Sequence, residues 1–331
     1  MKTTFKLPYI FIFLNVFALL FTNVHAKTCN PAVRDSLKME IGYEGINTVV
    51  GTVASFDPCH RSVSLRTPFF AEKPALMILV HGGAGLVAGT QNAADAFRSI
   101  GMATLVFDAF EMNGFYQGPR FFATSVTLEA KQRMIYQAAL GAYEWAIQQE
   151  KIDNSRIFFH GLSNGAIVVA NLAAVVNPRH VVALLAEGAP SQGIGLPNEI
   201  KAPLKMIYGR LDNYGGRTVE HFIWARQQPC RQNVVVPTLP PGNSATCNRQ
   251  TGGLSQAPID WFEDQKAKGA NVELMWLDET AHGVFDGPIV KNMISYTNGI
   301  DRFAWVGGSS KSRKRLLELV QALVKDPRLE R

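Results

Sequence analysis

Short apolar runs alternate along this chain with longer segments that repeat apolar residues every three or four positions. The run at 75–83, "ALMILVHGG", is apolar almost throughout and ends in two glycines, which is typical of a buried strand. The segment at 127–149 has the spacing of an amphipathic helix. Strands and helices in alternation over this length predict an α/β fold, with a mostly parallel central sheet and helices on both faces.

The same alternation extends over most of the chain. Further strands are expected at 102–108, 156–161, 181–189, 203–212 and 272–278. Further helices are expected at about 92–101, at 164–176 and from Lys311 to Val324. A pair of early strands is predicted at 47–56 and 61–68. Because 47% of the residues are hydrophobic, the chain has enough apolar side chains for a large packed core.

Residues 1–26 have the pattern of a signal peptide. Two lysines precede an apolar run at 7–21, and "VHA" then supplies small residues for cleavage after Ala26. The alternative is an uncleaved membrane anchor. With cleavage, residues 27–331 form the mature domain, which we expect to be secreted or periplasmic and to contact a membrane only through the signal peptide.

The charge of the chain is mildly positive. The formal net charge is +6, and removal of residues 1–26, which hold two lysines and no acidic residue, leaves +4. Such a small excess does not indicate a nucleic-acid partner. The basic run at 311–315, "KSRKR", opens an amphipathic segment, and we interpret it as the solvated face of a helix rather than a patch for nucleic acid or lipid.

The stretch "GLSNG" places one serine between two glycines, where a predicted strand meets a predicted helix. Ligands of open parallel sheets bind at the carboxyl ends of the strands. Gly161 and Gly165 leave space for the sharp, strained turn of a nucleophile elbow, which presents Ser163 above the sheet. We therefore expect Ser163 to be a nucleophile; the alternative is a helix N-cap serine in a glycine-rich turn.

A serine hydroxyl needs a base to take its proton. His282 follows the last predicted strand in the small-residue loop "ETAHGVFDG", from which it can reach Ser163. The base needs an orienting carboxylate, and Asp212 stands just past another strand end. The order Ser163, Asp212, His282 is the order in which elbow enzymes carry their triad. Glu187, one strand earlier, and Asp286, close to His282, are alternative acids.

The oxyanion formed in acyl transfer needs donors that are already in place. The backbone amide of Asn164, next after the serine, is one candidate. The other is expected in the loop "HGGAGL", where Gly83 is our choice and Ala84 the next; the alternative is a plain glycine-rich turn. Two further histidines have structural interpretations: His81 is predicted to shape this loop, and His160 to be a packed or hydrogen-bonded core residue.

All four cysteines lie in the predicted mature domain. An even number in an oxidising compartment favours disulfide bonds. We predict the pairs Cys29–Cys59 and Cys230–Cys247, each closing a short loop, although the sequence allows three pairings. No Cys-x-x-Cys pair or neighbouring histidine indicates a metal site. The second pair lies within 227–258, a segment rich in Pro, Gly, Asn and Thr that we expect to be a disulfide-tied insertion near the active site.

Four stretches carry a resemblance to known proteins: "LMILVHGGAGL", "HGLSNGA", "MIYGRLDN" and "ETAHGVFDG". Together they resemble the α/β-hydrolase fold and, within it, the dienelactone hydrolase family, over roughly Pro74 to Val324. The resemblance implies an enzyme that cleaves esters through its own side chains, with no metal or organic cofactor.

Two positions differ from the founding members of that family. Those members use a cysteine nucleophile where this chain has Ser163, and they keep a glutamate just after the third strand where this chain has Gly82. Since that glutamate holds a resting thiol neutral, a serine enzyme has no need of it, and the two changes agree. They favour a general carboxylic ester hydrolase over a lactone hydrolase.

The leading hypothesis is an exported serine hydrolase that acts on a small-molecule or polymer-attached ester through an acyl-enzyme. A serine peptidase of the same fold is one alternative, because a triad serves both reactions. A non-catalytic binding or envelope protein that retains the fold is another.

Overall fold

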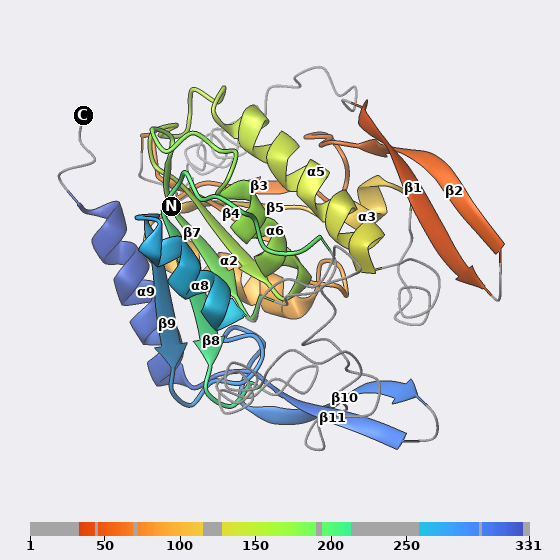
Figure 1. Ribbon diagram of the computed structural model, residues 1–331. Helices are drawn as coiled ribbons and strands as arrows, with labels where there is room; N and C mark the ends of the chain where they lie inside the picture. Colours follow the sequence, from red (N-terminus) through yellow and green to blue (C-terminus); the bar gives the residue numbers. More distant parts are fainter. Residues whose placement is uncertain are drawn as a thin grey trace, which may run out of the picture.

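A seven-stranded sheet forms the centre of the molecule (Figure 1). The computed structural model describes residues 33–43, 46–68, 72–114, 128–189, 194–212, 258–297 and 300–326. The strand order is β3-β5-β4-β6-β7-β8-β9. Their bounds are β3 Ser64–Arg66, β4 Leu76–Val80, β5 Ala103–Val106, β6 Ile157–Leu162, β7 Val181–Glu187, β8 Leu204–Gly209 and β9 Val272–Leu277. Only β3 runs antiparallel to its neighbour, so the predicted mostly parallel sheet is confirmed.

Helices cover both faces of this sheet, as the alternating pattern predicted (Figure 1). One face packs against α2 (Ala88–Ser99) and α9 (Ser310–Val324). The other packs against α5 (Leu128–Ala146), α6 (Asn164–Leu172) and α8 (Pro258–Ala267). This two-sided arrangement agrees with the α/β-hydrolase fold expected from the sequence.

The apolar character of the strands follows from this double cover. Every residue of β4 is buried. Leu76 and Ile78 point to the cluster beneath α5 and α6, whereas Met77 and Leu79 point to the cluster beneath α2 and α9. Side chains of a strand alternate between the faces of its sheet, so a strand covered on both faces needs apolar residues at every position.

Two hairpins stand apart from the sheet (Figure 1). The first joins β1 (Val33–Tyr43) to β2 (Ile46–Ala54), and the second joins β10 (Val290–Thr297) to β11 (Ile300–Val306). Both early strands predicted from the sequence form, as β2 and β3, but β2 pairs with β1 and β3 pairs with β5. The strands β1, β10 and β11 were not predicted.

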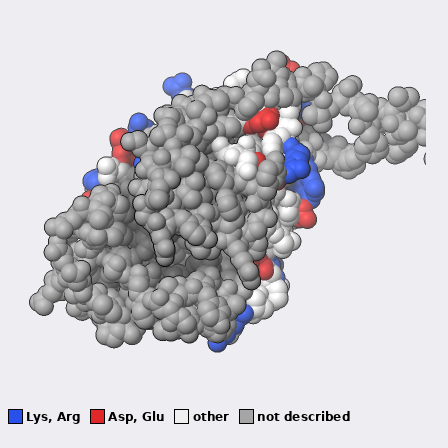
Figure 2. Space-filling view, turned by 90° about the vertical axis from the view of Figure 1, so that its right-hand side faces the viewer, with Lys and Arg blue, Asp and Glu red and all other residues white. Residues whose placement is uncertain are grey.

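The surface on the side of the hairpins carries both kinds of charge (Figure 2). On this face the visible Lys and Arg side chains of the described residues lie near Asp and Glu side chains. None of the helices in the described part of the chain is long and apolar enough to span a membrane. Partners and localisation therefore stay predictions.

Several sequence predictions lie outside the described residues. They include the signal peptide at 1–26 and, except for Pro258, the predicted insertion at 227–258. Cys29, Cys230 and Cys247 also lie outside, whereas Cys59 lies inside. Both disulfide pairings consequently stay predictions.

Candidate active site

Ser163 stands at the junction of β6 and α6 with a strained backbone. Its φ is 56° and its ψ is −117°, a combination that residues other than glycine rarely adopt. Such a conformation costs about 1–3 kcal/mol and persists only where the surrounding structure imposes it. The turn between strand and helix has the form of the predicted nucleophile elbow.

The two flanking glycines permit this turn because backbone comes very close to both. A Cβ added to Gly165 would lie 2.2 Å from the carbonyl oxygen of Val80 in β4. A Cβ added to Gly161 would lie 2.3 Å from the carbonyl oxygen of Gly165. No side chain fits at either position, so the helix α6 can pack directly on the central strands.

His282 and Asp212 form a buried pair at the ends of two neighbouring strands. Asp212 follows β8, and His282 lies in the loop after β9. The Nδ1 atom of His282 donates to Oδ2 of Asp212 at 2.9 Å, and both side chains are nearly enclosed. Burial by itself lowers the pKa of His282, but the charge of Asp212, its hydrogen bond and the charges of Glu187 and Asp286 together outweigh burial, so that the pKa is raised above its usual value.

The elbow of Ser163 adjoins this pair. The amide of Ser163 donates to the carbonyl oxygen of Glu187 at 2.9 Å. The next residue, Gly188, faces the pair: a Cβ added there would lie 3.0 Å from the ring of His282 and 3.2 Å from Oδ2 of Asp212. The three predicted triad residues are therefore gathered at one end of the sheet, with Ser163 one strand away from the point where Gly188 meets the imidazole.

The loop that carries His282 is held by the end of β11. The amide of His282 donates to the carbonyl oxygen of Trp305 at 3.1 Å. In turn, the amide of Gly307 donates to the carbonyl oxygen of His282 at 2.9 Å. The amide of Ala281 donates to Gly307 at 2.8 Å. Sequence reasoning missed this support, although the aromatic and β-branched residues of "IDRFAWV" are typical of a strand.

The predicted oxyanion residues also lie next to each other. Gly83 is in a tight turn in which the amide of Gly85 donates to the carbonyl oxygen of Gly82 at 3.2 Å. A Cβ added to Gly83 would lie 2.7 Å from the side-chain nitrogen of Asn164. Asn164 is the first residue of α6, where backbone amides have no acceptor within the helix. Its side-chain oxygen accepts from Gln132 of α5 at 3.2 Å, a contact that the sequence did not suggest.

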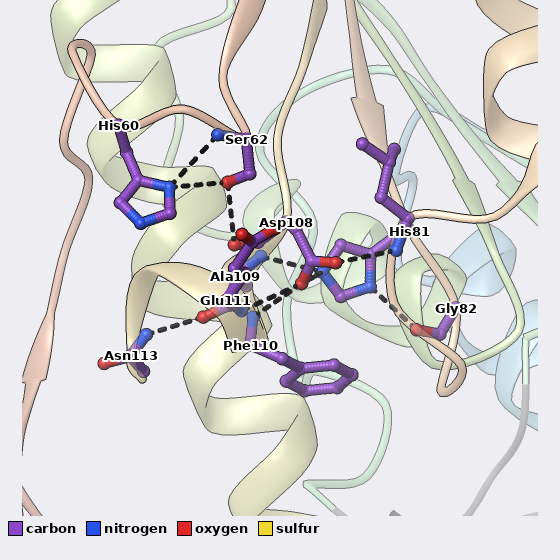
Figure 3. A network of polar contacts seen from close by, with 10 residues as sticks. His60, Ser62, His81, Gly82, Asp108, Ala109, Phe110, Glu111 and Asn113 are labelled. Carbon is purple, nitrogen blue, oxygen red and sulfur yellow. Dashed lines mark hydrogen bonds and ion pairs between the residues drawn. The ribbon is translucent and has the colours of Figure 1, made fainter. Parts of the chain in front are cut away.

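A buried histidine shapes this loop, as predicted (Figure 3). Nδ1 of His81 donates to the carbonyl oxygen of Gly82 at 2.8 Å, and Nε2 accepts from the amide of Ala109 at 2.9 Å. These two bonds require one neutral tautomer, which agrees with the effect of burial in lowering the pKa of His81. Asp108 completes the arrangement, because its Oδ2 accepts from the amide of Leu86 at 3.1 Å while its Oδ1 caps α3 (Ala109–Met112).

The alternative acids have other partners. Oε2 of Glu187 accepts from Nε2 of His160 at 3.0 Å, so the prediction of a hydrogen-bonded core histidine is confirmed. The carboxylate of Asp286 lies against Gly89 and Gly283, where added Cβ atoms would meet it. Burial, together with the charge of Glu187, raises the pKa of Asp286 to about 6.

The described parts of the chain contain no group of three or more His, Cys, Asp and Glu side chains that is arranged to hold a metal ion. The absence of a cofactor stays a prediction.

No protein-family model and no curated protein matches this chain. Several solved structures are similar to it. The dienelactone hydrolase from Anabaena variabilis ATCC 29413 is 12% identical, with 87% of this chain and 96% of that chain covered and a TM-score of 0.45. Est1E from Butyrivibrio proteoclasticus is 14% identical, with 89% and 98% covered and a TM-score of 0.41. A serine hydrolase homologue from Coxiella burnetii is 15% identical, with 78% and 89% covered and a TM-score of 0.42. Likeness at this level concerns the course of the chain and does not extend to activity or substrate.

Proposed function

We propose that this protein is an exported serine hydrolase that cleaves carboxylic esters. The observation that carries the proposal is the strained, positive-φ backbone of Ser163 beside a buried His282–Asp212 pair. A plain helix cap has no need of that strain, because an N-cap serine takes up an ordinary extended conformation. The proposed substrate is a small-molecule or polymer-attached ester.

In the first step, Oγ of Ser163 attacks the carbonyl carbon of the ester. His282 accepts the hydroxyl proton on Nε2, because Nδ1 already carries the hydrogen that is donated to Asp212. The negative charge of Asp212 stabilises the imidazolium that forms. His282 then passes the proton to the leaving alcohol, and an acyl-enzyme remains.

The negative charge that develops on the carbonyl oxygen is proposed to be held by the amides of Gly83 and Asn164. Each such donor is worth about 3–4 kcal/mol of transition-state stabilisation. Water then attacks the acyl-enzyme, His282 takes a proton from that water and returns it to Oγ of Ser163, and the carboxylic acid leaves. Every proton transfer in the cycle uses the same imidazole.

A fluorophosphonate probe tests the nucleophile directly. We expect the purified protein to be labelled once per chain, with the label on Ser163 in a peptide map, and to hydrolyse p-nitrophenyl esters faster than peptide anilides. In protein secreted by an exporting host, the intact mass of the labelled chain also tests cleavage after Ala26. Labelling of another residue would contradict the assignment, faster anilide cleavage would favour a peptidase, and failure of folded protein to react would favour a binding protein.

Gly188 offers a test of the spacing within the site. Replacing Gly188 with Ala puts a methyl group 3.0 Å from the ring of His282, so the ring must move by a few tenths of an ångström. We expect kcat to fall about tenfold or more, since small displacements of catalytic groups are costly. Steady-state kinetics with a p-nitrophenyl ester measures the loss.

The matched control is Gly269→Ala. Gly269 has a φ of 79°, close to the 62° of Gly188, but an added Cβ meets nothing within 4 Å. Both variants should lose about 1 kcal/mol of unfolding free energy from the left-handed backbone. Only Gly188→Ala should lose activity, and an equal loss in Gly269→Ala would show that backbone strain rather than contact with His282 is responsible.

A further inference from the structure

Glu187 is a buried carboxylate that bridges two elements next to the candidate active site. The residue is only 2% exposed. Oε1 accepts from the amide of Val284, two residues after His282, while Oε2 accepts from Nε2 of His160 at 3.0 Å. The first bond ties the loop that carries the base to the end of β7. The second ties Glu187 to the strand that leads into the elbow.

The second partner of Glu187 is itself fixed. The ring of His160 packs between Phe97 and Phe285, with ring centres 5.6 Å from each. Glu187 and His160 line a cavity of about 10 Å³, which has room for about one water molecule. The carboxylate is thus held in a single orientation within a low-dielectric surrounding, where its charge is weakly screened.

Several charged groups face this carboxylate. His160 reaches it from β6, whereas His282 and Asp286 lie in the loop after β9 and interact with its charge. Asp212, beyond Gly188, faces the same imidazole. On the far side of the loop, Arg313 of α9 donates to the carbonyl oxygens of Val284, Gly287 and Gly308. His282 therefore has three acidic neighbours: Asp212 accepts from its ring, and Glu187 accepts from a backbone amide of its loop.

Given the hydrolase chemistry proposed above, on which this role depends, we propose that Glu187 is a positioning residue that fixes the loop of His282 through Val284 and places a negative charge beside the imidazole. The charge stabilises the protonated form of His282, as the charge of Asp212 also does. A base must be neutral to accept a proton, so kcat/KM falls as the pH drops through the pKa of His282. Glu187 thus raises the pH at which activity begins to fall.

Two substitutions of Glu187 distinguish the effect of its hydrogen bonds on the loop from the effect of its charge on His282. In Glu187→Gln the side-chain oxygen still reaches the amide of Val284, but the charge is gone. We expect the acid limb of the kcat/KM profile to move down by about half a pH unit to one pH unit, with less than about a threefold change in the plateau. The shift is limited because Asp286, relieved of its repulsion by Glu187, ionises more fully.

In Glu187→Asp the charge remains, but the shorter side chain cannot reach both Val284 and His160. We expect the acid limb to stay within about 0.3 pH units of the wild type while the plateau of kcat falls about tenfold. Glu273→Gln is the control for loss of a carboxylate, because Glu273 is an exposed residue of β9 that pairs with Lys205. It should change neither the acid limb of the profile nor the plateau of kcat. An unshifted limb in Glu187→Gln, or an unchanged plateau in Glu187→Asp, would overturn the proposal.

The pKa of His282 can also be read without turnover. We expect proton NMR titration of the imidazole signals, with His282 assigned by its loss in His282→Gln, to show the same downward shift in Glu187→Gln. If the wild type has no esterase activity and the shift is present, the hydrolase proposal fails while the coupling between Glu187 and His282 stands. If the wild type is active and the shift is absent, only the role of Glu187 fails.

Discussion

Ser163→Ala is expected to lower kcat/KM for carboxylic esters by about 10⁴- to 10⁶-fold while leaving the protein folded. The substitution removes the atom that forms the acyl-enzyme, so fluorophosphonate labelling should disappear as well. The folded state should survive because the elbow is maintained by the close backbone contacts of Gly161 and Gly165 and not by the hydroxyl. Kinetics on purified protein, with circular dichroism to verify folding, measures both expectations.

Ser163→Gly provides the control for strain. Both variants lack the hydroxyl, but only the glycine variant relieves the backbone at a φ of 56°. We expect both variants to be inactive. We also expect the unfolding free energy of Ser163→Gly to exceed that of Ser163→Ala by about 1 kcal/mol or more. The gain from relieving the strained backbone is partly offset, because glycine has greater conformational freedom in the unfolded chain. Full activity in either variant would remove Ser163 from the mechanism.

Asp212→Asn is expected to lower kcat by about 10⁴-fold. The Asn side chain can donate its amide hydrogen to Nδ1 of His282. The ring of His282 then carries its own hydrogen on Nε2. That tautomer cannot take the proton of Ser163. The loss should therefore appear in kcat rather than in KM, and the folded structure should be little affected, because the new side chain has the same shape.

Asp286→Asn is the matched comparison for this prediction. Asp286 is also an acidic neighbour of His282, but its carboxylate lies against Gly89 and Gly283. We expect it to lower kcat less than about tenfold. A larger loss in Asp286→Asn than in Asp212→Asn would transfer the role of orienting acid from one residue to the other.

The central sheet was predictable from the sequence because each of its buried strands is covered on both faces. A strand of that kind appears as a continuous apolar run such as "LMILV" in β4. The strand β1, which was not predicted, lacks such a run, since "VRDSLKMEIGY" mixes charged and apolar residues. The partners of the early strands were not predictable either. The sequence suggested that β2 and β3 form a pair, whereas β2 pairs with β1 and β3 pairs with β5.

The candidate site was predictable to a similar extent. Strand ends in a parallel sheet converge, so Ser163, Asp212 and His282 were singled out by their places after β6, β8 and β9. The role proposed for Glu187 was beyond such reasoning. It also ends a strand, but only its side-chain direction, toward His160 and the amide of Val284, distinguishes it from an orienting acid.

The bonds between the loop of His282 and the residues after β11 have a consequence for synthesis. A polypeptide leaves the ribosome from its N-terminus, so Ser163 is made long before Trp305 and Gly307, on which the loop depends. Until those two residues have emerged, the loop of His282 lacks these hydrogen bonds, even though Ser163, the proposed nucleophile, is already present. If the proposed function is right, a nascent chain would therefore be inactive until the residues that follow β11 had been made.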